Sequence, residues 1–146
     1  MKIPEDIYER ILDLATSLTN ASEAGDTKFY WNLYGELRKF CEGESESGRD
    51  HPFLWETLAD FTSDDRAAIT LYAKALASAN DPAAAGDRAS IQLAMAERYR
   101  DLGDPALARK FAVAANEEAK ALDDLELRRS ISEFLLSASE HITTER

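Results

Sequence analysis

The chain has 146 residues, of which 45% are hydrophobic and 31% are charged, and its formal net charge is -11 at pH 7. This length fits one domain, and the acidic surplus repels phosphate backbones and anionic lipids, so nucleic acid and membrane surfaces are not expected partners. Cys41 is the single cysteine, which excludes an intrachain disulfide. Because the chain also shows no apolar signal run and no spanning segment, we expect a cytoplasmic protein.

Apolar residues recur at helical spacing through the first third of the chain. They predict a first helix from Pro4 to about Ala24 and a second helix that ends near Glu42, with a Gly25-Asp26 turn between them. The segment 43–50 has no apolar side chain to anchor it, so we expect a mobile loop there.

The rest of the chain predicts five more helices. His51-Pro52 opens the third, and Thr62-Ser63-Asp64 offers turn and cap chemistry before the fourth, which ends near residue 80. Asp87 is expected to cap the fifth, and Gly103-Asp104-Pro105 turns the chain into a sixth that ends near residue 122. A seventh helix is expected over about 124–143. No segment alternates as a strand does between hairpin turns, so the predicted class is all-α.

The helices pair in sequence order, and the second helices of three pairs align about 40 residues apart, a typical period for helical repeats. Within residues 92–122, Ala96, Tyr99, Gly103, Ala108 and Ala115 put small and aromatic residues where two antiparallel helices touch. In these residues the chain resembles the tetratricopeptide-repeat (TPR) family. The resemblance implies a right-handed stack of antiparallel helical hairpins, a TPR-like α-solenoid of one domain over 1–146. Its hairpins would span about 4–42, 52–80 and 85–122, and the seventh helix would cap the stack.

In that family the first helix of each hairpin lines a concave groove that binds a partner. By position, the resemblance implies that the groove is lined by Phe53, Glu56, Asp60, Leu93, Glu97 and Arg100. For Leu93 the alternative is packing against a neighbouring hairpin.

Trp31 is a further partner-binding candidate, because a helical wheel places it away from the buried stripe and near Arg38. Aromatic and arginine side chains together often anchor protein interfaces. The alternative is that Trp31 packs against the neighbouring hairpin or the loop that follows.

Residue patterns for catalysis, metals and cofactors are absent from the sequence. The two histidines, His51 and His141, are far apart, and Cys41 lies on an apolar helix face that favours a buried, inert thiol. No nucleophile elbow or phosphate loop occurs. We therefore expect no catalytic, cofactor or metal site. A small helical enzyme with Glu56 and Asp60 buried together is the catalytic alternative.

These patterns predict a non-catalytic protein-binding module whose acidic groove binds another protein with a basic surface. The most specific form of this hypothesis is an immunity-type inhibitor that neutralises a basic cognate toxin. The alternatives are a chaperone or adaptor for a secreted effector and a self-associating scaffold. We expect a monomer or a weak homodimer.

Overall fold

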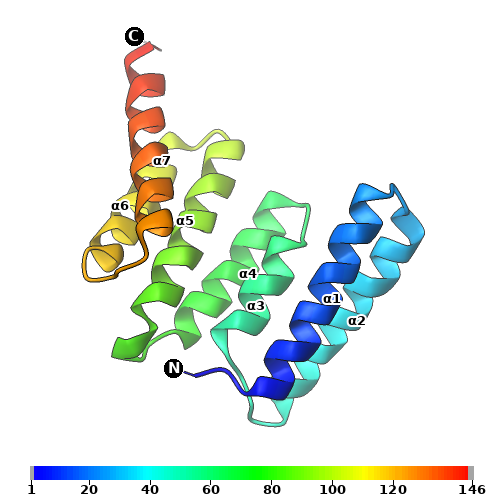
Figure 1. Ribbon diagram of the computed structural model, residues 1–146. Coiled ribbons are helices and arrows are strands. Elements are labelled where there is room, and N and C mark those ends of the chain that lie inside the picture. The colour runs from blue at the N-terminus through cyan, green and yellow to red at the C-terminus, as the bar shows by residue number, and fades with distance from the viewer. Residues whose placement is uncertain (1, 145–146) are drawn as a thin grey trace.

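The structure is a computed structural model that describes the backbone of residues 2–144 and the side chains of residues 2–137. Within residues 2–144 the chain forms seven α-helices, one short 3-10 helix and no strand, which confirms the all-α prediction (Figure 1). The elements are α1 (Glu5–Glu23), α2 (Thr27–Glu46), α3 (Pro52–Asp60), α4 (Asp65–Ser78), η1 (Pro82–Ala84), α5 (Ala85–Asp101), α6 (Pro105–Ala119) and α7 (Leu125–Thr144).

The turn between α1 and α2 has the predicted chemistry. Gly25 adopts a positive φ of 69°, a conformation that glycine reaches without a steric penalty. Asp26 then caps α2 by accepting a hydrogen bond from the backbone N–H of Phe29 at 3.1 Å. This pattern recurs at the turn between α5 and α6, where Gly103 has a φ of 78° and Asp104 accepts from the N–H of Leu107.

The second helix is longer than predicted. It continues to Glu46, so the expectation of a mobile loop is wrong for residues 43–46. Gly48, with a φ of 83°, ends the helix instead of Gly43. The segment that follows is held by an ion pair between Arg49 and Glu44 at 2.9 Å and by the Trp55 indole N–H, which donates to Asp50 at 2.7 Å. Polar contacts of this kind anchor a segment that has no apolar side chains.

Two further boundaries differ from the prediction. Asp87 does not cap α5, because the short helix η1 precedes α5 and is itself capped by Asp81, which accepts from the N–H of Ala83. Asp87 lies instead inside the first turn of α5. At the other end, α6 stops at Ala119, before the predicted end near residue 122.

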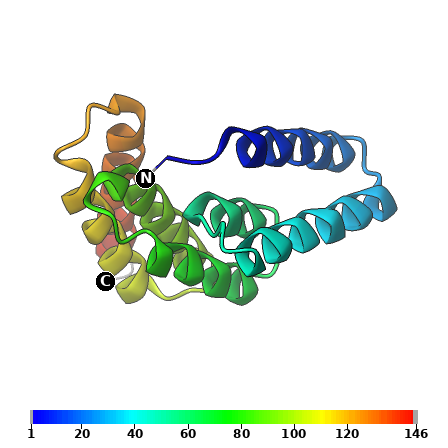
Figure 2. The same cartoon turned by 90° about the horizontal axis from the view of Figure 1, so that it is seen from below.

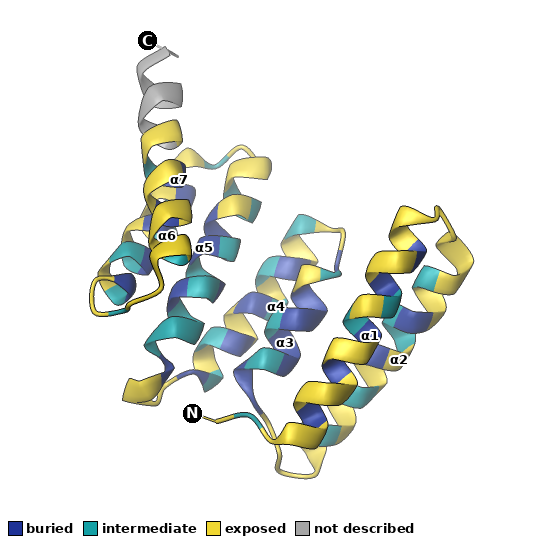
Figure 3. Ribbon diagram, in the orientation of Figure 1, coloured by how far each residue is buried: buried dark blue, intermediate teal, exposed yellow. Residues whose placement is uncertain are grey.

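Each α-helix packs against the next one along the chain, and α3 also contacts both α1 and α5 (Figures 1 and 2). Buried residues line the sides that face neighbouring helices (Figure 3). They form one core from α1 to α5 and a second core from α5 to α7. Cys41 is fully buried in the first core, where its thiol donates to the carbonyl of Leu54 and burial raises its pKa to about 12. None of the described helices combines the length and the apolar character needed to cross a bilayer.

Candidate functional site

Acidic side chains of α3 and α5 meet on one surface of the molecule. Glu56 and Asp60 are four residues apart on α3, and residues at this spacing share one side of a helix. On α5, Asp87 lies three residues before Ser90, and Glu97 lies seven residues after it. These three side chains therefore also share one side of their helix. The Ser90 hydroxyl donates to the Glu56 carboxylate at 2.7 Å and joins the two helices. We call the four carboxylates Glu56, Asp60, Asp87 and Glu97 the acidic face.

Glu56 is the most perturbed carboxylate of the acidic face. Its pKa is raised from 4.5 to about 7, chiefly because burial removes water from the charged form. The hydrogen bond from Ser90 opposes this effect, while the negative charges of Asp60 and Asp87 add to it. The Glu56 carboxylate is therefore held in a place where its charge is unfavourable.

Asp60 and Glu97 are shifted in the same direction. Burial raises the pKa of Asp60, although the hydroxyl of Tyr72 donates a hydrogen bond to its carboxylate and Arg98 lies near enough to oppose the shift. Burial also raises the pKa of Glu97. The charge of Arg100 opposes this rise, and the charges of Asp101 and Asp60 add to it. Asp60 thus acts electrostatically on both Glu56 and Glu97, which places the three carboxylates in one cluster.

Arginine side chains of the chain offset the charges of the acidic face only in part, since Arg98 opposes the pKa rise of Asp60 and both Arg100 and Arg98 oppose that of Glu97. Within the described residues, no lysine or arginine forms an ion pair with any of the four carboxylates, whereas several acids elsewhere are paired. Those ion pairs include Arg10 with Glu36, Arg38 with Glu42, Arg49 with Asp6, Arg88 with Glu118, Arg98 with Asp65 and Lys120 with Glu117. The acidic face is consequently suited to a cation from outside.

An apolar surface adjoins the acidic face. Phe53, three residues before Glu56 on α3, is half-buried against the ring of Tyr8 on α1, with ring centroids 5.7 Å apart. Tyr8 is 43% exposed, and Leu12, one turn further along α1, is 44% exposed. We call Tyr8, Leu12 and Phe53 the apolar patch. Tyr8 and Leu12 were not predicted from the sequence, although each directly follows a residue of the buried stripe and the two are four residues apart.

Leu93 and Arg100 lie beside Glu97 on α5, since Glu97 is four residues after Leu93 and three before Arg100, and the charge of Arg100 opposes the rise in the pKa of Glu97. They are seven residues apart on α5, on the side that faces α7. Leu93 is 8% exposed and belongs to the second core, so packing against neighbouring helices, the alternative interpretation, is what the structure shows. The guanidinium of Arg100 lies 4.6 Å from the ring centroid of Phe134 on α7. Of the six predicted groove residues, Phe53, Glu56, Asp60 and Glu97 lie along the surface shared by α3 and α5, whereas Leu93 is buried beside it and Arg100 lies at its edge against α7.

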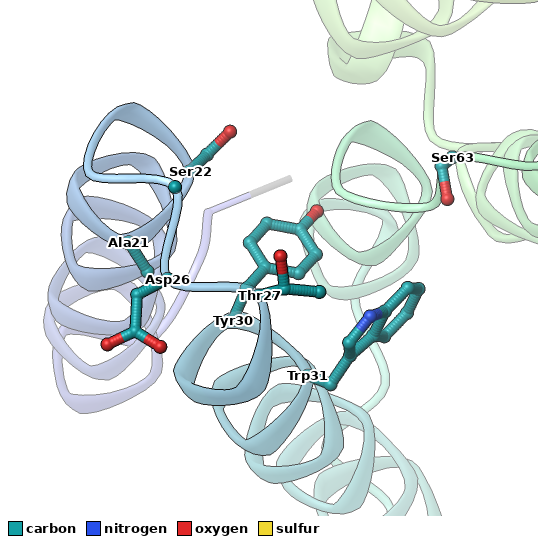
Figure 4. A pocket seen from close by; sticks show the side chains of 8 residues that line it. Ala21, Ser22, Asp26, Thr27, Tyr30, Trp31 and Ser63 are labelled. Atoms are coloured by element: carbon teal, nitrogen blue, oxygen red, sulfur yellow. The ribbon is translucent and has the colours of Figure 1, made fainter.

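Trp31 is separate from both surfaces. It is 52% exposed, so a neighbouring hairpin does not bury it. Its ring stands edge-on to Tyr30 and Tyr34 of the same helix, at 5.5 and 5.8 Å. Trp31, Tyr30 and Ser63 line a cavity of about 300 Å³ at the α1–α2 turn (Figure 4). Its ring contacts do not include any residue of the acidic face.

No three histidine, cysteine, aspartate or glutamate side chains among those that the structure describes are arranged to hold a metal ion. No protein-family model, curated protein or solved structure matches the chain.

Proposed function

We propose that this protein is a protein-binding module that binds a basic partner protein through the acidic face, and that its helices form a TPR-like stack of hairpins. Two observations support the stack. Glycine-aspartate turns join α1 to α2 and α5 to α6. In addition, the first helices of successive pairs touch, since α3 contacts both α1 and α5. Such a stack presents these three helices on one side.

The observation that carries the proposal is a cluster of carboxylates that form no ion pair with any lysine or arginine in the part of the chain that the structure describes. The pKa values of Glu56, Asp60 and Glu97 are all raised chiefly by loss of water around the carboxylates, and because Asp60 and Glu97 are exposed residues, the free-energy cost of the charge is greatest at Glu56. A lysine or arginine from a partner would remove much of that cost. Complementary charge also accelerates association and favours basic partners over acidic ones.

Within this proposal the narrower role is an inhibitor that covers the basic active site of a cognate toxin. A chaperone or adaptor for a secreted effector would use the same acidic face. The identity of the partner separates these roles, so affinity purification with the tagged protein followed by mass spectrometry is the first experiment.

The decisive experiment then compares the affinity of that partner for two matched variants. One variant neutralises the acidic face by Glu56→Gln, Asp60→Asn and Glu97→Gln. The control neutralises three acids elsewhere by Asp13→Asn, Glu42→Gln and Glu117→Gln, which changes the net charge equally. We expect the first variant to bind about tenfold more weakly or worse, and the control to stay within about threefold. Equal losses in the two variants would mean that general charge, and not the acidic face, binds the partner.

One observation favours a second candidate, a small hydrolase. A carboxyl group with a pKa of about 7 is suited to general acid–base catalysis at neutral pH, and Glu56 accepts its hydrogen bond from a serine hydroxyl. This candidate ranks lower because the cavity at the α1–α2 turn and a second cavity, lined by Arg66 and Tyr99, both lie away from Glu56. Hydrolysis of p-nitrophenyl acetate that is lost in both Glu56→Gln and Ser90→Ala would support the hydrolase.

A further inference from the structure

The apolar patch and the acidic face meet along α3. Phe53 belongs to the patch, and Glu56 and Asp60 follow it on the same side of the helix. At 1.5 Å per residue, the two carboxylates lie about 4.5 and about 10 Å further along the helix axis. Figure 1 shows α3 between α1 and α5, so the patch spans the α1–α3 boundary and the acidic face spans the α3–α5 boundary.

The two residues that α1 contributes to the apolar patch are exposed although each directly follows a buried residue. Ile7 and Ile11 on α1 are fully buried, while their neighbours Tyr8 and Leu12 are each more than two-fifths exposed. The Tyr8 ring is positioned by its contact with Phe53, so the patch is preformed. An apolar centre bordered by charge is the usual composition of a protein interface.

We propose that the apolar patch and the acidic face together bind one amphipathic segment of the partner protein. An apolar side chain of this segment packs against Tyr8, Leu12 and Phe53, and its lysine or arginine residues lie against Glu56, Asp60 and Glu97. Neighbouring helix axes are about 8–10 Å apart and an extended chain advances about 3.3 Å per residue, so the basic residues follow the apolar one after about three positions. This inference rests on the proposed function and adds the chemistry of the partner segment.

Charge identifies the occupant of this surface. The chain carries a net charge of -11, so a second copy would bring acid against acid. A purely apolar segment would leave the acidic face covered and unpaired, at a cost in free energy. A segment with separate apolar and basic ends satisfies both surfaces at once.

Two fluorescently labelled peptides of identical composition test the proposal. Each has about twelve residues, long enough to cross three helices in an extended conformation. In the segregated peptide two leucines are followed, after a short glycine-serine spacer, by three arginines. In the interleaved peptide the leucines and arginines alternate. Fluorescence anisotropy at low salt measures the affinity of both peptides for the full chain.

Three variants complete the design. Tyr8→Ser with Leu12→Ser removes exposed parts of the apolar patch, and Leu125→Ser with Leu136→Ser is its control, because these leucines are 73% and 65% exposed and lie on α7. The third is the neutralised acidic face described above. Circular dichroism checks that every variant stays helical.

We expect the segregated peptide to bind about tenfold more tightly than the interleaved one, a difference typical of one buried apolar side chain. The apolar-patch variant should lose this preference, and its control should keep it. Equal affinity for the two peptides, or an unchanged preference in the apolar-patch variant, would overturn the inference. If both peptides then still bind wild type but not the neutralised acidic face, the proposed function stands without the inference. If the neutralised acidic face binds as wild type does, or no peptide binds, both fail.

Discussion

Ser90 on α5 donates a 2.7 Å hydrogen bond to Glu56 on α3, and this bond connects two helices that are separated in the chain by α4. The contact stabilises a carboxylate that burial would otherwise keep protonated near neutral pH. It ties the stability of the fold to the ionisation of the surface that we propose for binding.

The first prediction concerns the pH dependence of stability. The Glu56 pKa is about 7 in the folded protein and near 4.5 when the chain unfolds, so the folded state binds the proton more tightly. Protonated Glu56 therefore contributes to the free energy of unfolding. This contribution, roughly 3 kcal/mol at most, is fully present below pH 4.5 and is lost as the pH rises through 7. Asp60 and Glu97, whose pKa values are also raised, act in the same direction.

Glu56→Gln removes this loss while keeping an acceptor for Ser90. We expect the variant to be more stable than wild type at pH 8 by about 1–3 kcal/mol and nearly equal at pH 4. Urea denaturation across that range measures the difference. Glu42→Gln, on the exposed end of α2, serves as the control. A difference in unfolding free energy between Glu56→Gln and wild type that stays constant at every pH would contradict a raised pKa for Glu56.

The second prediction concerns Tyr72, which is 3% exposed and donates its hydroxyl hydrogen bond to Asp60. Tyr72→Phe leaves the carboxylate without this donor and should destabilise the protein by about 1–3 kcal/mol at pH 8. The loss should shrink at low pH, where Asp60 is protonated. In the background of Asp60→Asn the same substitution should cost less, which a double-mutant cycle by urea denaturation detects. An equal cost in both backgrounds would show that the bond contributes little.

The third prediction concerns Cys41. Burial raises its pKa to about 12, so almost no thiolate exists at pH 8, and the side chain is fully buried. We expect Ellman's reagent to modify the native protein only as fast as the chain opens, and to react at once in urea. The modification rate should therefore follow the stability of the variants above. Rapid, stoichiometric modification of the native protein would contradict the burial of this thiol.

The fourth prediction compares two glycines that both have open space around them. Gly103 has a φ of 78°, so Gly103→Ala forces an alanine into the left-handed region and should destabilise the protein by about 1 kcal/mol. Gly35 lies inside α2 at an ordinary helical φ, so Gly35→Ala should stabilise by about 0.5–1 kcal/mol. Thermal denaturation measures both. A neutral or stabilising effect of Gly103→Ala would contradict the turn geometry at Gly103.

Local signals explain which helix boundaries could be predicted. A capping side chain identifies its own helix start, and Asp64 and Asp104 are cases of this kind. The end of α2 could not be predicted, because Gly43 and Gly48 are both possible stops, and the ion pairs of Arg49 with Asp6 and Glu44 that accompany the later stop include a contact with a distant helix. Asp87 failed as a cap because Asp81, six residues earlier, caps the short helix that leads into α5.

The candidate site could be predicted only as far as local helical spacing determines which side chains lie together. Helical spacing alone places Glu56 beside Asp60, and the pairing of α3 with α5 brings in Glu97. The position of Leu93 depends on where α7 packs, which is not encoded in the residues of α5. The exposure of Tyr8 depends likewise on how much of α1 the helix α3 covers. The burial of Leu93 and the exposure of Tyr8 therefore depend on how whole helices pack, which the local sequence pattern does not determine.

The most direct test of the central claim is the pKa of Glu56, measured by carbon-13 NMR of its side-chain carboxyl in the free protein and in the complex with the partner that affinity purification identifies. We expect a value of about 7 in the free protein and a marked fall towards 4.5 in the complex, because a lysine or arginine then lies beside the carboxylate. A pKa that stays the same or rises on binding would show that no basic group reaches the acidic face.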